Sequence, residues 1–207
     1  MAVTTSTIAL KDGSGASQTG ATAADPAGVQ RAIVALDQAG AAFYRASAIF
    51  APVGTADRTV ISIKGSATKT VRISKIALFG TGTIVNAPFN LTRTSALGSG
   101  GTAVNPTIGK VDSGTVASAT AVVAHYTSAA QSLGTPVGQL GSAIVPVITT
   151  GTTVNSVPTA VLFPEAGGPI GQAIVLRGTS DFLEVNCASG NFATSAGYVI
   201  EWSEDGS

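Results

Sequence analysis

Apolar and polar residues alternate with a period of two in several short segments, and this pattern predicts β-strands rather than helices. The clearest alternation lies in Phe43–Phe50, Thr59–Lys64 and Tyr198–Glu204. Shorter apolar segments at Ala173–Arg177 and Phe182–Cys187 fit the same interpretation. Strands of this length and spacing, about seven or eight in all and separated by turns rich in Gly, indicate a sandwich of two β-sheets.

The segment Thr70–Phe79 changes phase along its length. It carries four large aliphatic residues, two in each phase: Val71, Ile73, Ile76 and Leu78. One extra residue around Ser74-Lys75 would return all four side chains to the same face of a sheet. We therefore predict a β-bulge or a local twist at this point.

An N-terminal arm at residues 1–57 is expected to precede the main domain at residues 58–207. Its segment Ser14–Ala24 is small and polar, with little to bury. Asp25-Pro26 can be the N-cap and first residue of a helix that carries Val29, Ile33 and Leu36 on one face and stops at Gly40. Alternatively, Gln30–Leu36 is an extended segment. The residues alone leave both interpretations open.

The middle of the chain, Lys110–Pro164, has less regular patterns. Thr115–Tyr126 can be a short helix, because it is rich in Ala, or a strand, because it contains two adjacent valines. Leu140–Thr150 and Ser156–Phe163 are apolar segments bounded by Gly and Pro. No Asp, Glu, Lys or Arg occurs from 113 to 164. Gly, Pro, Ser and Thr nevertheless interrupt this stretch too often for a membrane-spanning helix of about 20 apolar residues.

Charge is scarce throughout. Asp, Glu, Lys and Arg make up 11% of the 207 residues, and 11 basic residues balance 11 acidic ones. Domains of ordinary composition contain roughly 25%. A balanced, weakly charged surface lacks the basic footprint of a nucleic-acid-binding protein. It favours association with other protein surfaces, because little charge has to be desolvated.

The residue types that carry catalysis are few. His125 is the single histidine, and neither a Gly-x-Ser-x-Gly elbow nor a second metal ligand at useful spacing accompanies it, so a packing or surface imidazole is expected. The acidic residues Glu201, Glu204 and Asp205 are expected to be solvated at a strand end. We therefore predict no catalytic, cofactor-binding or metal-binding residues, no cofactor, and a chain that is not an enzyme.

Aromatic residues and the lone cysteine are expected to pack in the core. The seven Phe, three Tyr and one Trp are scattered over several segments, mostly at alternating core positions. Tyr126 and Trp202 are the best candidates for exposed rings that could stack on a ligand. Cys187 is the single cysteine, so no intrachain disulfide can form, and its apolar surroundings suggest a buried thiol.

Four segments together resemble one group of proteins. They are VTTSTIALKDGSGASQT near the start, ISIKGSATKTVRISKIALFG, the glycine-rich stretch that begins NLTRTSALGSGGTAVNP, and AIVLRGTSDFLEVNCASG with the closing IEWSE. In this order they resemble tailed-bacteriophage structural proteins with an N-terminal arm and a jelly-roll-like β-sandwich. The resemblance covers nearly the whole chain, and its motifs are architectural rather than catalytic, so it carries no functional residues over.

The resemblance implies an all-β fold, a jelly-roll-like β-sandwich preceded by an extended N-terminal arm, and it favours the extended interpretation of Gln30–Leu36. It also implies a virion protein made in the host cytoplasm, of the capsid decoration (cement) or head-fibre type. The implied partners are the major capsid protein and copies of the chain itself as a homotrimer, with no nucleic acid and no membrane.

The alternative function is a tail-associated sandwich that recognises a host surface glycan. Its binding residues would lie in three loops, Ser95–Thr107, Ala130–Gly138 and Ala188–Thr194, where only Asn105, Asn191 and Phe192 offer suitable side chains. A small hydrolase is a third possibility, and the shortage of His and carboxylate residues argues against it.

Overall fold

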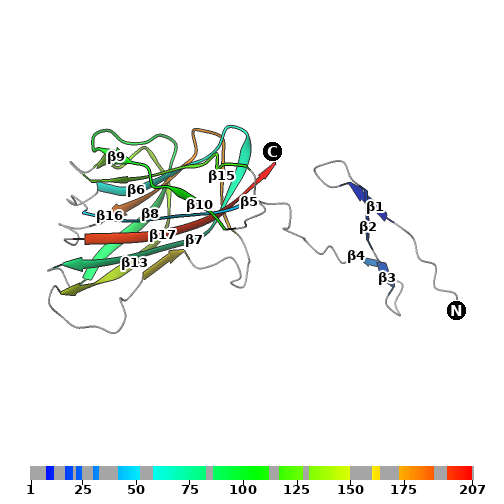
Figure 1. The fold of residues 1–207 in the computed structure, drawn as a ribbon, viewed down its shortest axis with the longest axis horizontal. Coiled ribbons are helices and arrows are strands. Elements are labelled where there is room, and N and C mark those ends of the chain that lie inside the picture. The colour runs from blue at the N-terminus through cyan, green and yellow to red at the C-terminus, as the bar shows by residue number, and fades with distance from the viewer. Residues whose placement is uncertain are drawn as a thin grey trace. The chain divides into compact units, whose positions relative to one another are not determined.

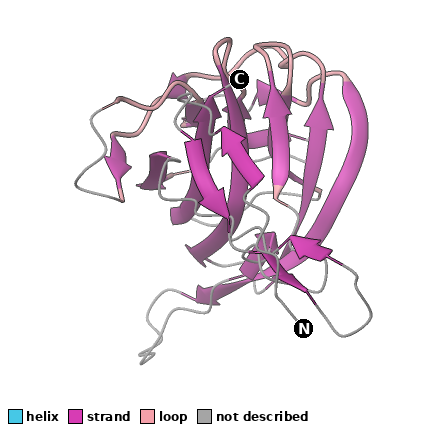
Figure 2. Cartoon of the chain, turned by 90° about the vertical axis from the view of Figure 1, so that its right-hand side faces the viewer, coloured by secondary structure: helices cyan, strands magenta, loops and turns pink. Residues whose placement is uncertain are grey.

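The computed structural model describes residues 8–11, 17–20, 22–24, 30–32, 42–51, 58–82, 86–111, 117–127, 131–149, 160–163, 173–188 and 195–206. Every regular element in these ranges is a β-strand, and they contain no helix (Figure 2). The predicted all-β class is therefore confirmed.

The chain divides into two compact units, residues 1–40 and residues 41–205, apart from its last two residues. The strands of the first unit are β1 (Ile8–Lys11), β2 (Ser17–Gly20), β3 (Thr22–Ala24) and β4 (Gln30–Ala32). β1 pairs with β2 and β3 pairs with β4, both antiparallel. Gln30–Ala32 is thus a strand, in line with the extended interpretation, whereas the remainder of the proposed helix lies outside the described residues.

The second unit holds thirteen of the strands in the described residues (Figure 1). They are β5 (Ala42–Phe50), β6 (Arg58–Lys64), β7 (Lys69–Gly82), β8 (Asn86–Thr94), β9 (Ala103–Val104), β10 (Ile108–Lys110), β11 (Val122–Tyr126), β12 (Gln131–Ser132), β13 (Pro136–Thr149), β14 (Ala160–Phe163), β15 (Ile174–Arg177), β16 (Phe182–Cys187) and β17 (Ser195–Gly206).

Eight of these strands form a jelly roll. In chain order they are β5, β6, β7, β8, β13, β15, β16 and β17, and they pair from the outside inward: β5 with β17, β6 with β16, β7 with β15 and β8 with β13, all antiparallel. One sheet, called here the β17 sheet, has the order β5-β17-β7-β15, and the other, the β16 sheet, has the order β6-β16-β8-β13. This is the connectivity of a long hairpin rolled into two sheets, so the expected jelly-roll-like sandwich is confirmed.

The unit boundary lies earlier than the expected boundary after residue 57. β5, which was assigned to the arm, is an internal strand of the β17 sheet and pairs with β17 from Ala42–Glu204 to Phe50–Ala196. The alternation in Phe43–Phe50 had predicted the strand, but a local pattern does not say which sheet a strand joins.

At each margin of the sandwich, one segment of the chain pairs with both sheets and so connects them. On one side, β13 pairs with β8 over Pro136–Pro146 and then runs parallel to β7 over Val147–Thr149. On the other side, β9 pairs with β11 in the β16 sheet, and β10, shortly after it in the chain, pairs with β5 in the β17 sheet. The two sheets are therefore linked at both margins as well as through their shared core.

The core is built from the inward faces of both sheets. In β5 the even-numbered Tyr44, Ala46 and Phe50 are buried, whereas Arg45 and Ile49 on the other face are exposed, as the alternation predicts. The largest fully buried side chains come from both sheets: Trp202, Tyr44, Tyr198, Phe89, Ile61, Ile63, Ile73, Ile76, Leu91, Leu176, Leu183 and Ile200.

Burial agrees with the bulge or twist that was predicted in β7 to bring all four of its large aliphatic residues to the core. Val71, Ile73, Ile76 and Leu78 are all buried, although the two pairs are in opposite phases of the alternation. The neighbour of β7 on one edge also changes here, from β15 to β14. In the middle of the chain, Val122–Tyr126 is a strand, so this part of the ambiguous segment Thr115–Tyr126 is not helical.

An ion pair joins the two sheets at one end of the sandwich. Arg93 of β8 binds Asp181 in the β15–β16 turn through both carboxylate oxygens, and its guanidinium also donates to the Val175 carbonyl at 2.9 Å. Asp181 in turn accepts from the Arg177 backbone N–H at 3.0 Å. The side chains of Arg93 and Asp181 are 33% and 16% exposed, so solvent screens this bidentate pair less than it screens an ion pair on the open surface.

We expect Asp181→Asn to lower the free energy of unfolding by about 1–3 kcal/mol, because the Arg93 guanidinium loses a charged, bidentate partner. Asp205→Asn is the matched control, since it removes one partner of the more exposed Arg72–Asp205 pair and should cost less than about 1 kcal/mol. Urea unfolding of both variants measures the difference. Equal losses would mean that the Arg93 pair has no special role in joining the sheets.

Candidate functional site

The single histidine lies between the two sheets. His125 of β11 is buried, with its ring centroid 4.8 Å from that of Phe50 and its Nδ1 3.2 Å from the Tyr198 hydroxyl. Burial lowers the pKa of His125 from the ordinary value of 6.5, and burial also raises the pKa of Tyr198 well above its usual range. Of the two expected environments for this imidazole, packing in the core is the one observed.

We expect His125 to make the fold less stable in mild acid. The unfolded chain takes up a proton near pH 6.5, whereas the folded chain resists protonation, so stability falls as the pH drops below 6.5. At pH 5.5 this single group can account for at most about 1.4 kcal/mol. His125→Gln keeps a hydrogen-bond partner for the Tyr198 hydroxyl. Urea unfolding of this variant should show a weaker pH dependence of the free energy of unfolding between pH 7.5 and 5.5. An unchanged pH dependence would mean that groups other than His125 cause it.

A carboxylate is buried on the outer face of the β16 sheet. Glu184 of β16 accepts hydrogen bonds from the hydroxyls of Thr59 and Thr94, the latter at 2.8 Å, and from the Gly134 N–H at 3.3 Å. Nearby on the same strands, the Thr92 hydroxyl donates to the Asn186 amide oxygen at 3.1 Å. The donors that bind this carboxylate are therefore two hydroxyls and a backbone amide.

Two loops cover Glu184, and they approach each other by backbone contact. The Ser95 N–H donates to the Thr135 carbonyl at 3.0 Å, and the Ser132 N–H donates to the Ser99 carbonyl at 3.0 Å. A Cβ on Gly134 would lie 1.9 Å from the Ala96 carbonyl oxygen and 2.4 Å from a Glu184 oxygen. Position 134 therefore requires glycine, because any side chain would prevent this close packing. The two loops together cover the Glu184 carboxylate.

Glu184→Gln should lower the free energy of unfolding by about 1–3 kcal/mol, because its amide group brings a donor to a site already filled with donors. Glu201→Gln is the control, since Glu201 pairs with the exposed Arg45 on the surface and its loss should cost less than about 1 kcal/mol. Thermal or urea unfolding compares the two. A Glu184→Gln protein as stable as the control would mean that the charge of Glu184 is not needed.

The acidic cluster at the C-terminal end is not uniformly solvated. Glu204 is buried, and its carboxylate accepts from the Thr120 and Ala121 N–H groups at 2.9 Å and from the Trp202 indole N–H at 3.0 Å. The prediction of a solvated Glu204 was therefore wrong. Glu201 and Asp205 instead form ion pairs with arginines on neighbouring strands, and Glu204 anchors the segment ahead of β11.

Tyr126 and Trp202, the best candidates for exposed rings, are both buried, in agreement with the expectation that the aromatic residues pack in the core. Trp202 stacks on Tyr44 with ring centroids 5.8 Å apart, inside the core. The Tyr126 hydroxyl lies 3.0 Å from the Ser62 Oγ, and burial raises the pKa of Tyr126. Neither ring can stack on a ligand from solvent. The predicted burial of Cys187 is confirmed.

Of the three loops considered for glycan recognition, two lie together. Residues 95–99 and 132–135 form the paired loops over Glu184, and Asn105 is exposed just beyond them. Asn191 and Phe192 lie outside the described residues. The described part of these loops presents one exposed amide and no exposed aromatic ring.

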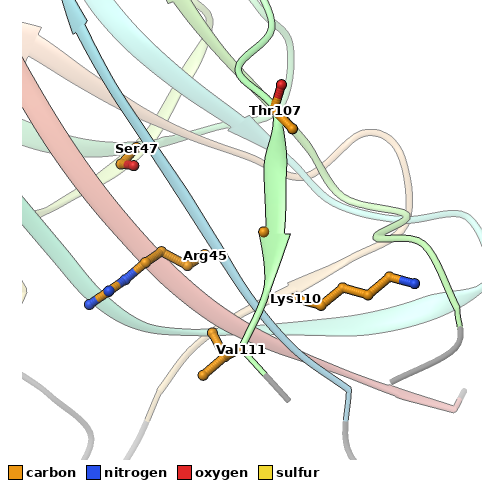
Figure 3. Close-up of a pocket in the computed structure, with 6 residues that line it drawn as sticks. Arg45, Ser47, Thr107, Lys110 and Val111 are labelled. Carbon is orange, nitrogen blue, oxygen red and sulfur yellow. The ribbon is translucent and has the colours of Figure 1, made fainter. Parts of the chain in front are cut away.

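A pocket lies on the outer face of the β17 sheet, where β5 meets β10. Figure 3 shows the Arg45 and Lys110 side chains extending away from each other on either side of β10. Arg45 pairs with Glu201, so its charge is matched within the sheet. The two cations therefore do not converge on one ligand position. The lining residues are Arg45, Ser47, Thr107, Gly109, Lys110 and Val111.

Within the described ranges, no three His, Cys, Asp or Glu residues come together in a group that could hold a metal ion. The same ranges contain no helix long and apolar enough to cross a membrane. Comparison of the chain with protein-family models, with curated proteins and with solved structures found no match.

Proposed function

We propose that this chain is a non-enzymatic structural protein of a tailed-phage virion, a capsid decoration or head-fibre protein that binds the assembled shell. The observation that supports this most is the division of the chain into a small strand-containing unit at residues 1–40 and a compact jelly roll at residues 41–205. Such a division suits a protein that attaches through one part and projects the other.

The energetics of attachment fit the composition. A protein that binds a shell has to bury flat surface against capsid subunits, and each charged group on that surface adds a desolvation cost. With 11% charged residues and no net charge, this chain keeps the cost low. The short strands β1–β4 belong to two-stranded sheets, which are marginally stable alone in water, and pairing with a partner's sheet edge would add backbone hydrogen bonds.

The glycan-recognition alternative has less support. Tyr126 and Trp202, the rings that could have stacked on a sugar, are both buried. The basic residues around the β5–β10 pocket do not converge on a ligand (Figure 3). A role in attachment therefore accounts for more of the observed features than a role in sugar binding.

Deletion of residues 2–24 should abolish uptake by capsids and leave the sandwich folded, because the jelly roll uses no strand from this segment. Purified capsids lacking this protein are mixed with full-length or truncated chain, sedimented, and assayed for bound protein. Unfolding curves of the truncated chain verify that residues 41–205 stay folded. Full occupancy by the truncated protein would contradict attachment through the N-terminal unit.

A further inference from the structure

Exposed apolar side chains gather on one strand of the sandwich. Eight large hydrophobic residues are exposed in the described ranges, and three of them lie on β13: Val137 at 66% exposure, Leu140 at 46% and Ile144 at 64%. Single exposed apolar residues are ordinary on protein surfaces, but several on one strand point to an interaction.

The same strand is an edge of the β16 sheet. Over Pro136–Pro146, β8 is the one described strand that pairs with β13, and the parallel contact with β7 begins only at Val147. Natural proteins usually protect a long edge strand with charged residues, bulges or proline. β13 has register shifts at 136–138 and 139–141, but the chain carries no charge from 113 to 164. The regular part, 141–146, therefore has neither a charge nor a bulge, and its one proline, Pro146, stands at its end.

We propose that this edge binds the same edge of a second copy, as an antiparallel pair centred on Ser142. This register places Leu140 of one copy opposite Ile144 of the other, and the contact occurs twice because the two-fold axis repeats it. Leu140, Ser142 and Ile144 are all exposed, and the residues between them, Gly141 and Ala143, are small enough for close approach.

A second copy matches this edge better than a charged partner does. Opposed strands are destabilised by like charges directly across from each other, and two copies of β13 bring none together. The apolar pair from Leu140 and Ile144 provides the contact area, and homodimer interfaces are typically more apolar than other interfaces. The proposal concerns the jelly roll alone and does not depend on a virion role.

Ser142→Cys tests the register directly. Cross-strand Cβ atoms in an antiparallel pair lie about 4.5–5.5 Å apart, close enough for a disulfide after a small adjustment. With oxidised glutathione as oxidant, the full-length variant should give a disulfide-linked dimer on a non-reducing gel. Ser47→Cys, at an exposed serine on β5, is the matched control and should stay monomeric on the gel, and the buried Cys187 is common to both. No dimer from Ser142→Cys would overturn the register.

Ile144→Lys tests the contact itself, because it places two like charges in the interface. The wild-type mass by light scattering should be that of a two-fold assembly, and the variant should show half that mass. Ile49→Lys is the control, since Ile49 is 73% exposed on β5, away from the edge, and should leave the mass unchanged. A wild-type monomer, or a trimer that Ile144→Lys does not dissociate, would refute the proposal.

Discussion

The sandwich depends on one constraint, which is that its first strand pairs with its last. β5 lies beside β17 along its whole length, and the pairs β6–β16, β7–β15 and β8–β13 follow inside it. Each pair joins segments that are far apart in the chain. A shift of one residue in any register would move that strand's apolar side chains to the wrong face. The stacking of Trp202 on Tyr44 follows from the β5–β17 register, which places the two residues opposite each other.

Strand positions could be predicted from the sequence because burial on a sheet repeats every second residue, which is a local property. The change of phase in β7 could be found for the same reason. The burial of Glu184 and Glu204 could not, because distant segments cover these side chains: the loops 95–99 and 132–135 lie over Glu184, and residues 120–121 lie over Glu204. Thr59 and Thr94 were the available signal, as hydroxyl residues on the two strands beside Glu184.

In this weakly charged chain, the partners of a carboxylate depend on whether it is buried or near the surface. Glu184 and Glu204, the two buried carboxylates of the described residues, are held by hydroxyl, backbone and indole donors, whereas the ion pairs of Arg45, Arg72 and Arg93 lie at the margin of the core or on the surface. Neutral donors hold a carboxylate without a second buried charge, which avoids the desolvation of a basic partner. A weakly charged chain can in this way keep acidic residues inside and leave its outer surface apolar enough to associate.

The two loops over Glu184 have a consequence for motion. Because the Gly134 N–H binds the carboxylate and the Ser95 and Ser132 N–H groups bind the opposite loop, separation of the loops admits water to a charge at the centre of the sheet face. Separation therefore removes several hydrogen bonds at once rather than one at a time. The amide hydrogens of both loops should exchange with solvent through one shared opening, so that residues about 35 positions apart in the chain behave as a single cooperative unit.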